Sequence, residues 1–209
     1  MQFKLLNLGV LIPLTILIVF MYWYQWGTNV LSPAEVDHYM TKIETQTQTP
    51  GAQHDLPALR KFLNEDDGKP IYTVNLYKFN AVADYPKATG FSGTGEQAYD
   101  RFSEVMVPLM VKRGSHPIFG SNWADEASSN WDRIVIVRYR SRRDLVDLFA
   151  TDDFAEASLH KWASLQDHNR MLVQGIHIPD GVYVITLIAI LIGLAMQLVQ
   201  KQTLRPRHS

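Results

Sequence analysis

Two histidines and one adjacent acid–base pair are the residues of this chain whose types could carry out chemistry. They are His116, His160, Asp132 and Arg133. An imidazole titrates near neutral pH, and a neighbouring carboxylate or guanidinium can help it to move a proton or to orient a polar ligand. We predict these four residues as catalytic candidates. The structural alternative stays open, because an Asp–Arg ion pair at the start of a strand can simply fix a hairpin and a helical histidine can hydrogen-bond within the core.

A second group of residues could bind a ligand. Polar side chains among aromatic ones can anchor a small apolar or aromatic molecule, and this argument selects Asn75, Tyr77, Asn122 and Trp131. Asn75 is the strongest of them, since a buried amide needs a hydrogen-bond partner that a ligand or a water could supply. For Trp123, core packing is the more ordinary role.

Other kinds of site lack their sequence patterns. No His-Glu-x-x-His pattern occurs, and His54, His168 and His177 do not combine with carboxylates at the spacing of metal ligands. The glycines at 90, 93 and 95 lack the Gly-Lys-Ser/Thr ending of a phosphate-binding loop, and the chain has no cysteine. We therefore predict no metal and no cofactor. The 20 basic and 21 acidic residues nearly cancel, so the charge favours no nucleic-acid partner.

The elements that must position these residues alternate between strands and helices. β-Branched and aromatic residues predict strands over 70–79, 116–123, 131–139 and 170–176. Apolar spacings of three and four predict a helix from Tyr99 to Gly114, and two cap patterns predict helical segments between Ser141 and Leu165. The order β-α-β-β-α-β is that of a ferredoxin-like α+β fold, in which two helices cover one face of a four-stranded antiparallel sheet.

The third predicted strand is apolar on both faces. Ile134 and Ile136 alternate with Val135, Val137 and Tyr139. Two helices can cover only one face of the sheet, so we predict that a second copy covers the other and that the protein is a homodimer.

Long uncharged runs predict a membrane location. The runs 5–26 and 181–200 have the length of transmembrane helices, and the first ends in an aromatic belt of Tyr22, Trp23, Tyr24 and Trp26. Basic residues flank the outer ends, at position 4 and in the tail 201–209, which predicts cytoplasmic tails (1–4 and 201–209) on a bacterial inner membrane. In this arrangement a helical stalk (31–69) and the barrel domain (70–178) lie outside the cytoplasm, in the periplasm of a Gram-negative source.

The segment 70–174 resembles an uncharacterised family of the dimeric α/β-barrel superfamily, whose relatives include antibiotic-biosynthesis monooxygenases and muconolactone isomerases. The matching stretches are Ile71-Tyr-Thr-Val-Asn-Leu-Tyr77, Arg113-Gly-Ser-His-Pro117, the run from Trp131 to Asp144, Phe154-Ala155 and His160-Lys-Trp162. The resemblance implies that two sheets pack into a barrel and that each half encloses a small cavity between sheet and helices.

Two functions from different classes follow from these expectations. The first is the binding or metal-free conversion of a small apolar or aromatic molecule in that cavity, and it requires a closed pocket. The second is a non-enzymatic accessory role in a larger membrane protein complex, and it requires a filled cavity and an extra apolar patch outside the dimer.

Overall fold

The structure is a computed structural model, and it describes residues 2–26, 28–46, 54–86, 91–122, 130–175 and 181–203. The chain divides into two compact units, Met1–Gln174 and Gly175–Ser209. The first unit holds the sheet and the helices α1 to α6, and the second holds helix α7 (Gly181–Thr203).

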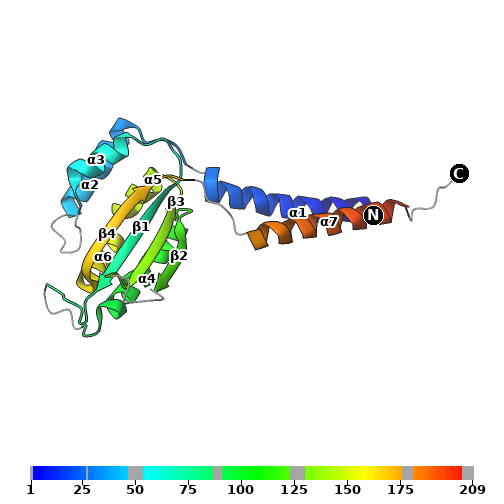
Figure 1. Cartoon of the computed structure of the whole chain (residues 1–209). Coiled ribbons are helices and arrows are strands. Elements are labelled where there is room, and N and C mark those ends of the chain that lie inside the picture. The colour runs from blue at the N-terminus through cyan, green and yellow to red at the C-terminus, as the bar shows by residue number, and fades with distance from the viewer. Residues whose placement is uncertain are drawn as a thin grey trace. The chain divides into compact units, whose positions relative to one another are not determined.

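A four-stranded antiparallel sheet forms the centre of the first unit (Figure 1). Its strands are β1 (Ile71–Phe79), β2 (His116–Asn122), β3 (Arg133–Tyr139) and β4 (Leu165–Val173), in the spatial order β2-β3-β1-β4. Strand β1 lies in the middle, with Asn75 opposite Val135 on one side and Arg170 on the other. The chain is therefore of the α+β class, as its strand and helix patterns predict.

Three helices cover one face of this sheet, and each begins at a side-chain cap (Figure 1). Thr94 and Gln97 form a capping box at the start of α4 (Gly95–Val111). Ser141 caps α5 (Arg142–Phe149), and Thr151 caps α6 (Asp152–Ser164). Strand β4 begins at Leu165, five residues before the predicted strand, because the chain becomes extended directly after α6.

The segment expected to act as a stalk contributes to the hydrophobic core. Helices α2 (Pro33–Gln46) and α3 (Leu56–Asn64) bury Val36, Ile43 and Leu63 in the same cluster as α5. An ion pair between Arg143 Nη1 and Glu35 Oε1, at 2.7 Å, joins α5 to α2. These contacts make α2 and α3 part of the folded domain.

The N-terminal aromatic segment also contacts the domain. Helix α1 (Gln2–Met21) is followed by a π-helix, η1 (Tyr22–Trp26). Trp23 Nε1 donates to the carbonyl oxygen of Val111 at 2.7 Å, and the guanidinium carbon of Arg138 lies 3.8 Å from the centre of the Tyr24 ring. Gly114 makes this approach possible, since a Cβ there would lie only 2.1 Å from the carbonyl oxygen of Trp23.

The expectation of two transmembrane helices is wrong. Within the part of the chain that the structure describes, no helix combines the length and apolar character needed to cross a bilayer. The regular α-helix ends at Met21, where the predicted belt turns to the domain, and α7 carries Gln197 and Lys201 in its last turns. The predicted two-pass location in an inner membrane, with cytoplasmic termini and a periplasmic domain, depended on these two helices. That prediction is therefore wrong as well.

Some expected features lie outside the described residues. They are the linker at 47–53, part of the glycine-rich loop at 87–90, Trp123 and the following turn, and His177.

Candidate functional site

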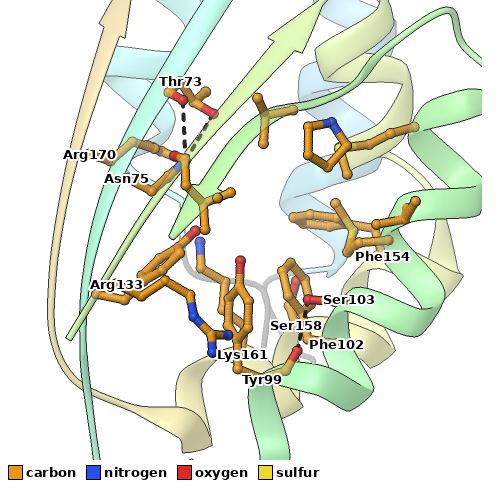
Figure 2. A pocket seen from close by; sticks show the side chains of 18 of the residues that line it. Thr73, Asn75, Tyr99, Phe102, Ser103, Arg133, Phe154, Ser158, Lys161 and Arg170 are labelled. Atoms are coloured by element: carbon orange, nitrogen blue, oxygen red, sulfur yellow. Dashed lines mark hydrogen bonds between the residues drawn. The ribbon is translucent and has the colours of Figure 1, made fainter. Parts of the chain in front are cut away.

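A cavity of about 450 Å³ lies between the sheet and helices α4 and α6 (Figure 2). Its walls carry several aromatic side chains, with Tyr99 and Phe102 from α4, Phe154 and Trp162 from α6, and Phe149 from α5. The volume falls within the range of small-molecule sites, about 300–1,000 Å³. The fold therefore forms a partly open pocket whose size and lining suit a small organic ligand.

The charged residues that line this cavity are all basic. They are Lys161 on α6, Arg133 on β3 and Arg170 on β4, and none of the described lining residues is Asp or Glu. Arg133 forms ion pairs with Glu96 and Asp100 at the N-terminal end of α4. Arg170 has no hydrogen bond or ion pair with a described residue, so its charge is available to a bound anion.

Lys161 is the most unusual of these basic groups. Its Nζ lies 4.9 Å from the ring centre of Trp162 and 5.8 Å from those of Tyr77 and Phe102. No described residue forms an ion pair or a hydrogen bond with this nitrogen. Burial, and then the charge of Arg170, lower the pKa of Lys161 to about 7. The neutral form of this amine is therefore favoured more than it is for an ordinary surface lysine.

Two histidines near Lys161 are also held in the neutral state. Burial, then Arg170 and Lys161, lower the pKa of His54 to about 4. Burial, then Lys161 and Arg170, lower the pKa of His168 to about 3. His168 stacks on Tyr77 with the ring centres 5.1 Å apart. The histidines therefore add no positive charge to the site near pH 7.

The phenols of the site are neutral as well. Burial raises the pKa of Tyr77, Tyr99 and Tyr139 above the usual range. Tyr77 and Tyr99 lie with their ring centres 4.9 Å apart. They can donate hydrogen bonds to a ligand without carrying charge.

Ser158 contributes an unsatisfied polar atom. It is 1% exposed, it lines the cavity, and its Oγ has no hydrogen-bond partner in the part of the chain that the structure describes. A buried hydroxyl without a partner is costly and points to a ligand group or water at that position.

Asn75 has partners within the protein. Its Nδ2 donates to Thr73 Oγ1 at 3.0 Å (Figure 2). It also donates to the carbonyl oxygen of Val135 at 3.1 Å, and Oδ1 lies 3.4 Å from His168 Nε2. The buried amide thus needs no ligand to satisfy its donors, although it does line the cavity.

The four catalytic candidates do not meet at one site. His160 Nδ1 is hydrogen-bonded to the Tyr85 hydroxyl at 2.7 Å, and neither residue lines the cavity. His116 pairs with Arg138 in the sheet and stacks against Trp23 on the opposite face. The structure thus separates the two imidazoles that the sequence analysis grouped.

Two roles were considered for Asp132 and Arg133, a structural one that fixes the hairpin and a role in a site. The structure gives the first to Asp132 and places Arg133 at the cavity. Asp132 accepts hydrogen bonds from Lys78 Nζ at 3.0 Å and from the backbone nitrogen of Phe79 at 2.7 Å, and so joins β1 to the start of β3. Arg133 alone of the four catalytic candidates lines the cavity.

The ligand-binding candidates divide in a similar way. Asn75 and Tyr77 line the cavity, whereas Trp131 is partly buried and does not. Asn122 pairs with Arg133 through the backbone, and its side chain is outside the described part of the structure.

Sequence analysis missed Lys161, Ser158 and Arg170. A signal was present for two of them, because Phe154, Ser158 and Lys161 follow one another at helical spacings of four and three. A lysine within the inward stripe of an amphipathic helix is unusual and indicates a buried amine. No comparable signal marks Arg170, whose place at the cavity depends on the pairing of β4 with β1.

No group of three or more His, Cys, Asp or Glu side chains arranged to hold a metal ion occurs among the described residues.

Comparison with known proteins supports the fold but assigns no activity to the chain. No protein-family model matches the chain, and no curated protein matches it. The crystal structure of the methylated RPA0582 protein is similar, with a TM-score of 0.55 and 20% identity over 61% of this chain and 96% of that one. A second structure, of the RPA0582 protein of unknown function from Rhodopseudomonas palustris, has a TM-score of 0.54 and 20% identity over 60% of this chain and 97% of that one. At this level of identity the likeness shows a shared fold alone.

Proposed function

We propose that this chain binds a small organic anion with an apolar or aromatic body in the cavity between the sheet and helices α4 and α6. The observation that carries the proposal is the lining of this cavity, which combines aromatic walls with Lys161, Arg133 and Arg170 and contains no acidic side chain among the described residues. Apolar walls contribute affinity for the body of the ligand, and a few placed polar groups select its charged end.

Electrostatics favours an anion over a neutral or cationic ligand. Arg170 lowers the pKa of Lys161, which means that the two positive charges repel each other in the empty cavity. A carboxylate at Arg170 would offset the charge of this guanidinium, relieve the repulsion and form charge-assisted hydrogen bonds. The affinity for such an anion also increases when Lys161 is protonated.

The alternative of a non-enzymatic accessory subunit requires a filled cavity. The space of about 450 Å³ among the described residues gives more support to ligand binding.

Calorimetric titration of the full chain with 3-phenylpropanoate and with 3-phenylpropylamine tests the proposal, because the two probes share a body and carry opposite charges. We expect the acid to bind and the amine not to bind. Arg170→Gln should weaken binding of the acid by roughly tenfold or more, since a hydrogen bond to a charged group contributes about 1.5–3 kcal/mol. The control, Arg60→Gln, removes an arginine that pairs with Asp37 on the surface, and it should change nothing. Equal binding of the amine, or unchanged binding in Arg170→Gln, would refute the proposal.

We also propose that a second copy of the chain covers the part of the other sheet face that the N-terminal segment leaves open. Val74, Leu76, Ile134 and Ile136 point to this face and are partly buried, and Phe119, Met171 and Val173 are 49%, 45% and 42% exposed. Helices α4 to α6 lie on the other face (Figure 1). A two-fold axis would bring the same uncharged patch from each copy together, as an isologous dimer requires.

A further inference from the structure

The amine of Lys161 has the surroundings of a nucleophile rather than those of a structural cation. A structural lysine pairs with a carboxylate, as Lys78 does with Asp132 at 3.0 Å. Lys161 instead extends among Tyr77, Phe102 and Trp162, at 4.9–5.8 Å from the ring centres, and pairs with no described residue.

Opposing effects decide the charge of this amine. The aromatic faces favour the ammonium form, because a cation near a ring is attracted to its π-electrons. Burial, and then the guanidinium of Arg170, favour the neutral form and lower the pKa of Lys161. The other titratable groups near this amine add no negative charge. Arg133 is itself positive, and Tyr77 and Tyr99 keep their protons. His54 in the cavity wall and His168, which stacks on Tyr77, are neutral.

Ser158 supplies the second, independent observation. It precedes Lys161 by one helical turn on α6 and lines the same cavity with a buried hydroxyl that has no partner. No hydrogen bond joins this hydroxyl to the lysine, so the amine does not activate the serine as a nucleophile. The arrangement leaves a free amine and a free hydroxyl facing one space.

We propose that Lys161 forms a reversible Schiff base with the carbonyl carbon of an apolar or aromatic oxo acid bound in the cavity. This inference rests on the proposed function, because the carboxylate is what the basic lining would hold. Figure 2 places Arg170 with Thr73 and Asn75 at one end of the cavity and Lys161 with Arg133 and Tyr99 at the other. An oxo acid extended across this space would place its carboxylate at Arg170 and its carbonyl towards Lys161.

The reaction balances without another reactant. The lone pair of the neutral Nζ attacks the carbonyl carbon, a C–N bond forms, and the C=O π-electrons move to oxygen. One proton moves from nitrogen to that oxygen and gives a carbinolamine, to which the Ser158 hydroxyl can hydrogen-bond. The C–O bond then breaks, water leaves with the second amine proton, and the C=N bond of the Schiff base forms.

Reductive trapping on the full chain tests this inference. The probes are phenylpyruvate and 4-oxo-4-phenylbutanoate, which differ in the distance from carbonyl to carboxylate, each reduced with sodium cyanoborohydride and analysed by intact mass and peptide mapping. We expect one adduct per chain with at least one probe, heavier than the protein by the ligand minus one oxygen atom, on the peptide that contains Lys161. Trapping should increase with pH around neutrality, well below the range in which an ordinary surface lysine loses its proton.

Matched variants and ligands separate the possible outcomes. Lys161→Arg keeps the charge and should abolish the adduct, and Lys78→Arg should keep it. Circular dichroism and retained binding of 3-phenylpropanoate show that Lys161→Arg is folded. Adducts spread over several lysines, or an adduct that persists in Lys161→Arg, would overturn the inference. Binding of the oxo acids and of 3-phenylpropanoate without any adduct would overturn the inference alone, whereas absence of all binding would overturn the proposed function.

Discussion

Ser158 and Lys161 lie one helical turn apart on α6, and both side chains line the cavity under the sheet. Among the described residues, the serine hydroxyl has no hydrogen-bond partner, and the lysine amine contacts aromatic rings rather than a carboxylate. The same helix buries Phe154, Ala155, Ala157 and Ala163, so most of its buried side chains are apolar. Two buried polar groups that form no hydrogen bond with each other lower the stability of the fold. Such a pair is typical of a ligand-binding site.

Replacement of Ser158 tests the cost of its unsatisfied hydroxyl. Ser158→Ala removes a buried oxygen that makes no hydrogen bond, so we expect the free energy of unfolding without ligand to increase by about 1 kcal/mol. Urea denaturation measures the change. The matched variant Ser103→Ala loses the hydrogen bond from Ser103 Oγ to the carbonyl oxygen of Tyr99 and should show no gain. A less stable Ser158→Ala would mean that the hydroxyl has a partner in solution.

The pH dependence of stability tests the state of Lys161. Its pKa in the folded protein, about 7, lies below the value of about 10.4 for an unfolded chain. Between these values the unfolded state binds more protons, so this group makes the protein more stable as the pH increases from 7 to 10 and destabilises it fully below 7. Lys161→Met removes the titration. We expect the variant to be more stable than the parent at pH 6 and to lose this part of the slope above pH 7. Parallel stability curves for parent and variant would contradict the burial of a charged amine.

Charge on the open part of the sheet face opposite helices α4 to α6 tests the dimer. Ile136→Asp places a carboxylate in the middle of the apolar patch, where desolvation in an interface costs several kcal/mol. Light scattering after size exclusion should show a change from dimer to monomer. Val82→Asp, at a side chain that is 72% exposed outside the sheet, should leave the mass unchanged. A parent protein that is already monomeric would rule out this interface.

The contact between the N-terminal segment and the domain predicts an effect of Tyr24. Its ring lies over the guanidinium of Arg138, a residue that is 2% exposed and hydrogen-bonded to Gln25. Tyr24→Ala should reduce the free energy of unfolding by about 1–2 kcal/mol, as a desolvated cation–π contact is lost. Tyr22→Ala removes a ring that is 63% exposed and is the matched control. Equal effects of the two variants on thermal unfolding would argue against a specific role for the Tyr24–Arg138 contact.

Local patterns were sufficient for most of the secondary structure. The caps at Ser141 and Thr151 have the hydrogen bonds that their sequences indicate, and Gly114 adopts the positive φ of 65° that ends the turn after α4. These features depend on residues close together in the chain, and local sequence therefore predicts them.

Long apolar runs were the least reliable guide. The run at 5–26 predicted a transmembrane helix with an aromatic belt, yet Trp23 and Tyr24 contact Val111 and Arg138. An exposed aromatic ring has the same sequence pattern whether it meets lipid headgroups or a protein surface, and only its tertiary partners distinguish the two.

The sequence by itself determined the α+β class, the positions of the helix caps and the apolar character of both faces of β3, because propensity and periodicity act over a few residues. It also placed Asn75, Tyr77 and Arg133 among the candidates for the site. Only the tertiary structure decided that His116 and His160 lie apart and that Lys161, Ser158 and Arg170 share a cavity. The reason is physical: the state of an amine depends on burial and on charges brought near it by strands and helices far apart in the chain.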